Sequence, residues 1–189
     1  MSDIFVDNIK HQSSQGSGTI TLGASGEKIN LGADAGGTIT ARPAFEAHLS
    51  ATQTVSDAVF TKVQSNTEVF DTDSCYDNST NYRFTPTVAG KYFVYGKVMT
   101  RAGATSLENG IIEIRKNGSS YVRQQIDLSS NRIDNNCVQA SAVIDMNGSS
   151  DYVELWGRTA TSGATSEFYG ASGATYKFTG FGAYRLIGA

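Results

Sequence analysis

The chain contains 189 residues, 17% of them charged, with a formal net charge of −3 and a pI near 5.3. This acidic balance argues against a general affinity for nucleic acid, and no apolar run reaches the roughly 20 residues that span a bilayer. Two cysteines, Cys75 and Cys137, are too few for a disulfide framework; two free thiols and a single bridge both remain open. The first residues show no basic and apolar leader, so we expect no secretory signal.

The first 42 residues are expected to form a stem that has no core of its own. Phe5 is their only aromatic residue, and glycines separate short apolar pairs that recur every nine to ten residues. Each pair predicts a minimal alternating strand with its apolar side chains on one face. A single chain leaves these faces uncovered, so we expect several copies around an axis; a disordered glycine-rich linker is the alternative. The predicted stem core consists of Ile20, Leu22, Ile29, Leu31 and Ile39.

Residues 43–189 contain every tyrosine, the tryptophan and the remaining phenylalanines, and they are expected to form one head domain. Asn117-Gly118 between two alternating runs predicts a tight hairpin, and Asn147-Gly148 predicts a second turn. No segment shows the periodicity of a long helix, so the pattern predicts an all-β, antiparallel jelly-roll sandwich. About ten strands are predicted, at 45–49, 58–63, 67–70, 81–85, 90–98, 111–116, 121–126, 138–145, 152–156 and 176–186. The expected core residues are Phe84, Tyr92, Phe93, Trp156, Phe178 and Phe181.

The head carries the motifs of a known family. Phe84, Pro86, Gly90 and Tyr92 occur in the same order as in the pattern Phe-x-x-Pro-x-x-Gly-x-Tyr, with Pro86 one residue earlier than in that pattern. Phe178-Thr179-Gly180-Phe181 is similar to a closing Phe-Ser-Gly-Phe. In these motifs, the chain resembles the globular head of the complement first-component q type, a relative of the tumour-necrosis-factor jelly roll. The match covers about 43–189 and departs by an insertion between Gly148 and Asp151. The resemblance implies a homotrimer of jelly rolls packed about a threefold axis.

The beginning of the chain carries a second resemblance. Residues 5–11, Phe-Val-Asp-Asn-Ile-Lys-His, precede the run Ser-Gly-Thr-Ile-Thr-Leu at residues 17–22. This order resembles the opening of fibre-like virion proteins of tailed bacteriophages, particularly marine ones. The resemblance implies that residues 1–42 attach the chain to other virion proteins.

The sequence predicts no catalytic site. His11 and His48 are the only histidines, and no Gly-x-Ser-x-Gly nucleophile motif or Cys/His metal cluster is present. Asp71, Asp73 and Asp77 fall in one expected loop, where their oxygens are weak candidates for calcium. The alternative is a solvated turn of Asp, Asn and Ser residues, and no cofactor is otherwise expected.

Three tyrosines are candidates for surface contact. Tyr169, Tyr176 and Tyr184 could form a saccharide platform, because aromatic faces pack on sugar C–H groups while hydroxyls bond at the rim. Tyr176 and Tyr184 lie an even number of residues apart on the predicted last strand, which places both on one face. Core packing or a subunit interface is the commoner use of such residues.

These observations together predict a non-enzymatic structural protein of a tailed-phage virion. It would be a homotrimeric tail fibre, spike or head-surface decoration, assembled in the host cytoplasm, with a head that contacts a host surface glycan or protein. No nucleic acid partner and no membrane insertion are expected. The alternative is a bacterial extracellular or surface lectin-like module with the same trimeric head, for which a signal peptide would be expected. A hydrolase is a third possibility, and it lacks a catalytic constellation.

Overall fold

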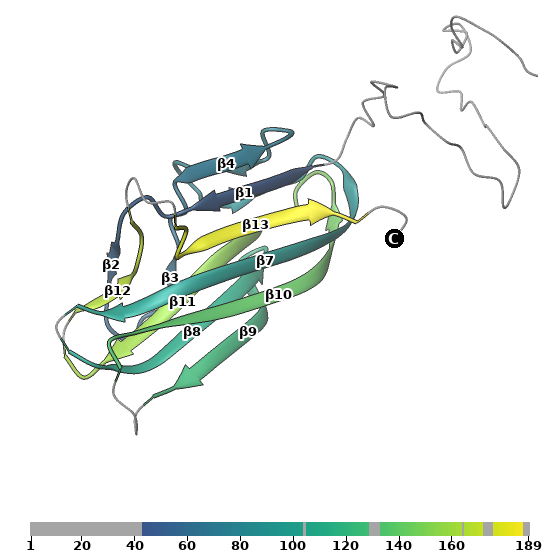
Figure 1. The fold of residues 1–189 in the computed structure, drawn as a ribbon. Coiled ribbons are helices and arrows are strands. Elements are labelled where there is room, and N and C mark those ends of the chain that lie inside the picture. Colours follow the sequence, from purple (N-terminus) through teal and green to yellow (C-terminus); the bar gives the residue numbers. More distant parts are fainter. Residues whose placement is uncertain (1–42, 104, 129–132, 164, 172–175, 187–189) are drawn as a thin grey trace, which may run out of the picture. The chain divides into compact units, whose positions relative to one another are not determined.

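The computed structural model describes residues 43–186 except 104, 129–132, 164 and 172–175 (Figure 1). Within these residues no helix is long and apolar enough to cross a membrane. The predicted stem and attachment segment, residues 1–42, lies outside the described residues, so both roles remain predictions. The same is true of the stem core positions Ile20, Leu22, Ile29, Leu31 and Ile39.

The regular structure of the described residues is entirely β, as the sequence predicts. The short early strands are β1 (Ala44–His48), β2 (Gln53–Val55), β3 (Thr61–Lys62), β4 (Thr67–Asp71), β5 (Tyr76–Asp77) and β6 (Arg83–Phe84). The longer central strands are β7 (Ala89–Ala102), β8 (Leu107–Lys116), β9 (Ser119–Asp127), β10 (Asn135–Asn147) and β11 (Val153–Thr161). The last two strands are β12 (Ser166–Phe168) and β13 (Gly180–Arg185).

The strands form two antiparallel sheets (Figure 1). Sheet A has the order β2-β12-β7-β13-β1-β4, with β10 also paired to β7. Sheet B has the order β5-β6-β11-β8-β9, with β3 also paired to β11. Most neighbours in the two sheets are distant in sequence, as β1 and β13 are, although β5–β6 and β8–β9 are consecutive; such crossovers between two sheets are typical of a jelly roll. The predicted all-β jelly-roll sandwich is therefore confirmed.

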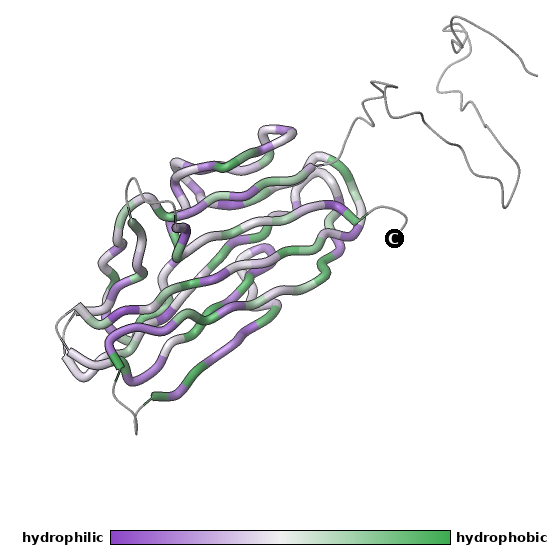
Figure 2. The backbone as a smooth tube through the Cα atoms, in the orientation of Figure 1, coloured by the Kyte–Doolittle hydropathy of each residue, from purple (hydrophilic) through white to green (hydrophobic). Residues whose placement is uncertain are grey.

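The core lies between the sheets and is built from every second residue of each strand. Along β7, Tyr92, Val94 and Val98 are fully buried and Gly96 is buried between them, whereas Phe93, Tyr95 and Lys97 are half-buried. Figure 2 shows hydrophobic and hydrophilic positions interspersed along the strands of both sheets. The ring of Phe45 stacks on Phe84 with 4.7 Å between centroids. Burying one such phenylalanine contributes about 2–3 kcal/mol to folding.

Three of the six predicted core residues occupy the core, namely Phe84, Tyr92 and Phe181. The prediction is wrong for Phe93 and Trp156, which are half-buried on the outer faces of the sheets. The reason is the two-residue period of a strand, in which inward-pointing neighbours force the residues beside them outward. Tyr92 takes the inward position before Phe93, and Leu155 takes the one before Trp156.

Phe178 is the third core prediction that the structure corrects. The last strand begins at Gly180 rather than at Tyr176, so residues 176–179 approach the sheet without joining it. Phe178 is half-buried there, against the ring of Tyr169 at 5.0 Å. The even spacing of Tyr176 and Tyr184 consequently has no structural meaning, because only Tyr184 belongs to the strand.

The two Asn-Gly pairs make different turns. Asn117 and Gly118 have φ values of 51° and 80° and close the hairpin between β8 and β9, as predicted. Gly148, with φ of 71°, instead links β10 in sheet A to β11 in sheet B. The Asn147 Oδ1 atom accepts hydrogen bonds from the amides of Ser149, Ser150 and Asp151, which fixes this crossover.

Strand β10 lies at one edge of sheet A, where it pairs with β7 alone. Side chains from sheet B reach the backbone of this edge. The Tyr121 hydroxyl donates to the carbonyl of Val143 over 3.2 Å, and the Lys116 ammonium donates to the carbonyl of Asp145 over 2.6 Å. These two bonds join the sheets at their open side.

Candidate functional site

The carboxylates of two predicted calcium ligands, Asp71 and Asp77, accept hydrogen bonds from backbone amides of tight turns. The Asp77 carboxylate accepts hydrogen bonds from the amides of Ser79, Thr80 and Asn81. These bonds, with that from Thr80 first, hold the pKa of the Asp77 carboxyl well below its usual value. In the part of the chain that the structure describes, no group of three or more His, Cys, Asp or Glu residues is placed to hold a metal ion. The geometry of this loop therefore favours the alternative, a turn of Asp, Asn and Ser residues, over a calcium site.

The Asp71 carboxylate also caps a turn, and it does not share a site with the Asp77 carboxylate. The Asp71 carboxylate accepts hydrogen bonds from the amides of Asp73 and Tyr76, at 3.4 and 2.8 Å. Beside this turn, Cys75 is a buried free thiol, and Cys137 is an exposed free thiol on β10. The structure thus contains two free thiols and no bridge between them.

The outer face of sheet A carries a band of large apolar side chains across several strands. Val143 of β10, Phe93 of β7 and Tyr184 of β13 stand directly opposite one another in register. The rings of Phe93 and Tyr184 are 5.5 Å apart, and Val143 and Tyr184 are each 46% exposed. We call Phe70, Phe93, Tyr95, Val143 and Tyr184 the aromatic face.

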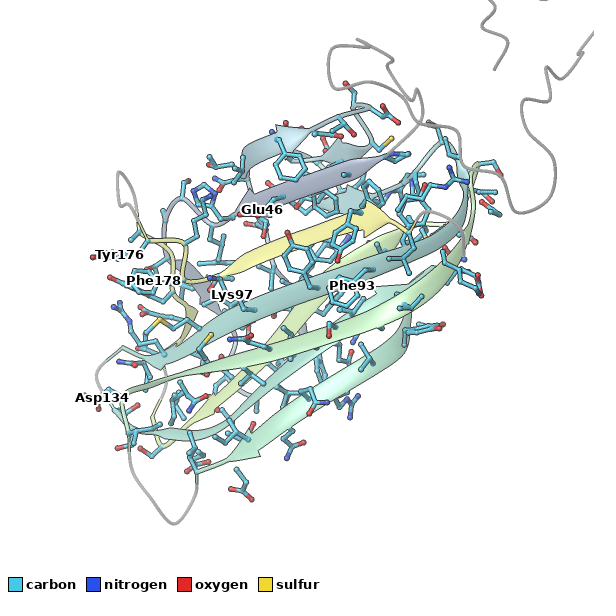
Figure 3. All side chains as sticks on the ribbon, turned by 45° about the vertical axis from the view of Figure 1, so that its right-hand side comes forward. Glu46, Phe93, Lys97, Asp134, Tyr176 and Phe178 are labelled. Carbon is cyan, nitrogen blue, oxygen red and sulfur yellow. The ribbon has the colours of Figure 1, made fainter. Side chains whose placement is uncertain are left out.

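A hollow of about 570 Å³ lies on the same face, where Phe93 and Tyr95 line it together with Glu46, His48, Lys97 and Gly180. Figure 3 labels Glu46, Phe93 and Lys97 among these residues. Two glycines of β13, Gly180 and Gly182, make this part of the sheet shallow. The Tyr95 ring lies across Gly182, and its hydroxyl donates to the Glu46 carboxylate over 3.2 Å. Burial and the nearby negative charge of Glu46 raise the pKa of Tyr95 to about 12.

His48 lies in the same hollow. Burial, followed by the positive charge of Lys177, holds the pKa of its imidazole below the usual value. Lys177 is 3.3 Å from the Glu46 carboxylate. The neutral imidazole is thus one of several polar groups on this sheet face. Among the described residues of that face, no nucleophile is hydrogen-bonded to it.

A second group of aromatic side chains lies at the other end of sheet A. Tyr169 and Tyr176 both contact Phe178, with ring centroids 5.0 and 6.2 Å away. The Arg101 guanidinium lies over the Tyr169 ring at 4.4 Å and forms an ion pair of 2.7 Å with Glu167. We call Arg101, Glu167, Tyr169, Tyr176 and Phe178 the distal aromatic cluster.

The structure brings together only two of the three predicted contact tyrosines. Tyr169 and Tyr176 share the distal aromatic cluster, whereas Tyr184 packs on Phe93 in the aromatic face. Arg101 and Phe178 were not predicted as surface residues. The register that brings β12 beside the end of β7 explains their placement, and no local pattern in the sequence indicates it.

The outer face of sheet B holds a charged and aromatic network that the sequence did not predict. Glu113 of β8 is fully buried and pairs with both Arg115 and Arg123. The Arg115 guanidinium lies 4.1 Å from the Trp156 ring and 5.4 Å from the Phe60 ring. Burial alone would raise the pKa of the Glu113 carboxyl, but hydrogen bonds from Arg115 and Arg123 outweigh it and lower that pKa. This network stabilises the outer side of sheet B.

Solved structures match this chain in fold, whereas no family model and no curated protein match it. Among solved structures, the TNF protein Eiger from S. frugiperda superposes with a TM-score of 0.53 and 12% identity, over 79% of this chain and 94% of that one. Murine APRIL superposes with a TM-score of 0.51 and 14% identity, over 77% of this chain and 99% of that one.

A complement structure is also among the matches. The globular domain of zebrafish complement 1qA superposes with a TM-score of 0.49 and 15% identity, over 77% of this chain and 98% of that one. At these identities the likeness concerns the fold. The superpositions on Eiger and on APRIL show that the described part of the chain has the TNF-type jelly-roll fold.

Proposed function

We propose that the chain is a non-enzymatic binding module that assembles as a homotrimer through the aromatic face of sheet A. The observation that carries this proposal is the row of Val143, Phe93 and Tyr184, which leaves rigid apolar surface exposed on a single chain. Contiguous exposed apolar surface of this kind marks interaction sites, and aromatic residues are enriched in the buried centres of subunit interfaces.

The number of three copies is supported by the sequence. The resemblance of residues 43–189 to the complement-type head implies a threefold assembly, and the apolar pairs of residues 1–42 also need neighbouring copies. The TNF-type jelly-roll fold is compatible with this arrangement. A trimer gives three identical heads, so weak contacts of each head with a repetitive surface add through effective concentration.

The proposed setting is the virion of a tailed phage. Residues 1–42 would bind other virion proteins, and the head would project as a tail fibre, spike or head-surface decoration that meets a host surface glycan or protein. The support is the resemblance of residues 5–22 to phage fibre-like proteins. The copy number and position of the protein on purified particles test this setting, and its absence from particles would favour the bacterial surface module.

Light scattering on the full chain tests the assembly. We expect three times the chain mass of 20.1 kDa for the natural sequence and a smaller mass for Tyr184→Asp, because a carboxylate would be desolvated in the interface. Val59→Asp is the matched control, since Val59 is 50% exposed in the segment before β3, away from the aromatic face. A single-chain mass for the natural sequence would refute the trimer.

A further inference from the structure

The distal aromatic cluster and the two chain termini of the head domain lie at opposite ends of the head. The Arg185 amide bonds to the Pro43 carbonyl, and the Leu186 amide bonds to the carbonyl of Lys91, near the start of β7. Arg101 is ten residues farther along β7, which corresponds to about 33 Å of extended strand. In Figure 3, Tyr176 and Phe178 lie side by side at one end of the sheet, with Phe93 toward the other.

The backbone that carries the cluster is held firmly. Thr179 is fully buried, and its hydroxyl donates to the Tyr169 carbonyl over 2.8 Å and accepts from the Met99 amide over 3.1 Å. The Tyr169 amide in turn donates to the Met99 carbonyl. One buried hydroxyl therefore links the segment of Tyr169 to that of Phe178, so the two rings are preorganised before any ligand arrives.

The cluster combines exposed ring surface with a neutralised polar rim. Tyr176 is 72% exposed, more than any other large apolar side chain of the described residues. The Arg101 guanidinium stacks on Tyr169, and its charge is balanced by the Glu167 carboxylate at 2.7 Å. The Arg101–Glu167 pair thus offers donors and acceptors together and carries no net charge of its own.

From this geometry we infer that the distal aromatic cluster binds an uncharged saccharide. The rings of Tyr176 and Phe178 would pack on the C–H face of a sugar, and the paired Arg101 and Glu167 would donate to and accept from its hydroxyls. A surface cluster of few rings and few polar groups suits a small ligand, whereas a stable protein interface needs about 800 Å² from each partner. This inference rests on the proposed binding function and names the ligand class for it.

The test is binding of the fluorescently labelled full chain to a printed array of microbial oligosaccharides and polysaccharides. We expect binding to a subset of uncharged glycans and at least tenfold weaker binding for Tyr176→Ala. Val59→Ala is the control, because Val59 is a 50% exposed apolar residue in the segment before β3, outside the cluster. Arg101→Met, which keeps the stem over Tyr169 but removes the donors, is expected to weaken binding by a similar factor.

Each outcome decides the inference. Binding to no glycan, binding to acidic glycans alone, or equal binding by Tyr176→Ala and the natural sequence overturns it, and the last result would also leave a protein contact as the use of the cluster. Light scattering on the same samples separates this inference from the assembly. A trimer without glycan binding contradicts the saccharide site alone, and a single chain that binds glycans through Tyr176 contradicts the trimer alone.

Discussion

Arg115 donates from its Nε atom to the Glu113 carboxylate over 2.7 Å, although the two residues belong to one strand and are only two positions apart. Residues at this spacing share one face of a strand, so the ion pair runs along the outer side of sheet B. Arg123 completes the pairing of Glu113 from the neighbouring strand β9. The carboxylate is fully buried even though it lies on the outer face, because aromatic and guanidinium groups surround it.

Replacement of Glu113 is expected to destabilise the head. Glu113→Ala leaves two guanidinium groups without their carboxylate, and we expect the free energy of unfolding to fall by about 2–4 kcal/mol. Urea unfolding followed by Trp156 fluorescence measures this change. Asp145→Asn is the control, since that carboxylate pairs with Lys91 but is 75% exposed, and a change below about 0.5 kcal/mol is expected. Equal effects of the two variants would contradict the role of burial.

Acid is expected to destabilise the head through carboxylates whose pKa is lowered by folding. The Asp77 carboxyl is one of them, so its contribution is complete above its unfolded-state pKa of about 4 and is lost as the pH falls through the folded-state value. We expect the Tm to drop between pH 5 and pH 2, and Asp77→Asn to flatten that drop while lowering the Tm at pH 7. An identical pH dependence in the variant would contradict this assignment.

Gly182 is expected to be required for the position of Tyr95. A Cβ atom at residue 182 would collide with the Tyr95 ring, so Gly182→Ala should displace the ring and break its bond to Glu46. We expect a loss of about 1 kcal/mol in urea unfolding. The double variant Gly182→Ala with Tyr95→Ala should lose less than the sum of the two single variants, because the collision is relieved. Strict additivity would show that the ring and the glycine do not interact.

Removal of residues 1–42 is expected to leave a folded head, because the described strands begin at Ala44 and bury their own core. Circular dichroism should still show the β spectrum of a folded head, and the shortened protein should fail to enter virions. Normal incorporation would refute the attachment role.

Replacing Ile29 and Leu31 with Asp should make residues 16–42 protease-sensitive in the full chain while sparing the head. Unchanged resistance of that segment would show that its apolar residues are not buried.

The sequence predicts the fold better than it predicts the outward-facing residues. Asn117-Gly118 identified a real hairpin, because its backbone requires positive φ at both positions. Phe93 and Trp156 were misplaced because aromatic residues occur on both faces of these strands, and a two-residue period does not say which face is buried. Arg101 and Tyr169 meet only because β12 pairs with the end of β7, a contact that no short-range signal predicts.

The covered edge of β10 limits how further chains can add to sheet A. An open strand edge recruits further strands, and repeated recruitment builds fibres. At this edge, the carbonyls of Val143 and Asp145 already accept hydrogen bonds from Tyr121 and Lys116 of sheet B. A strand arriving from another molecule would have to displace both donors. Extension of sheet A through β10 is therefore disfavoured, and this edge does not offer a route to open-ended stacking of heads.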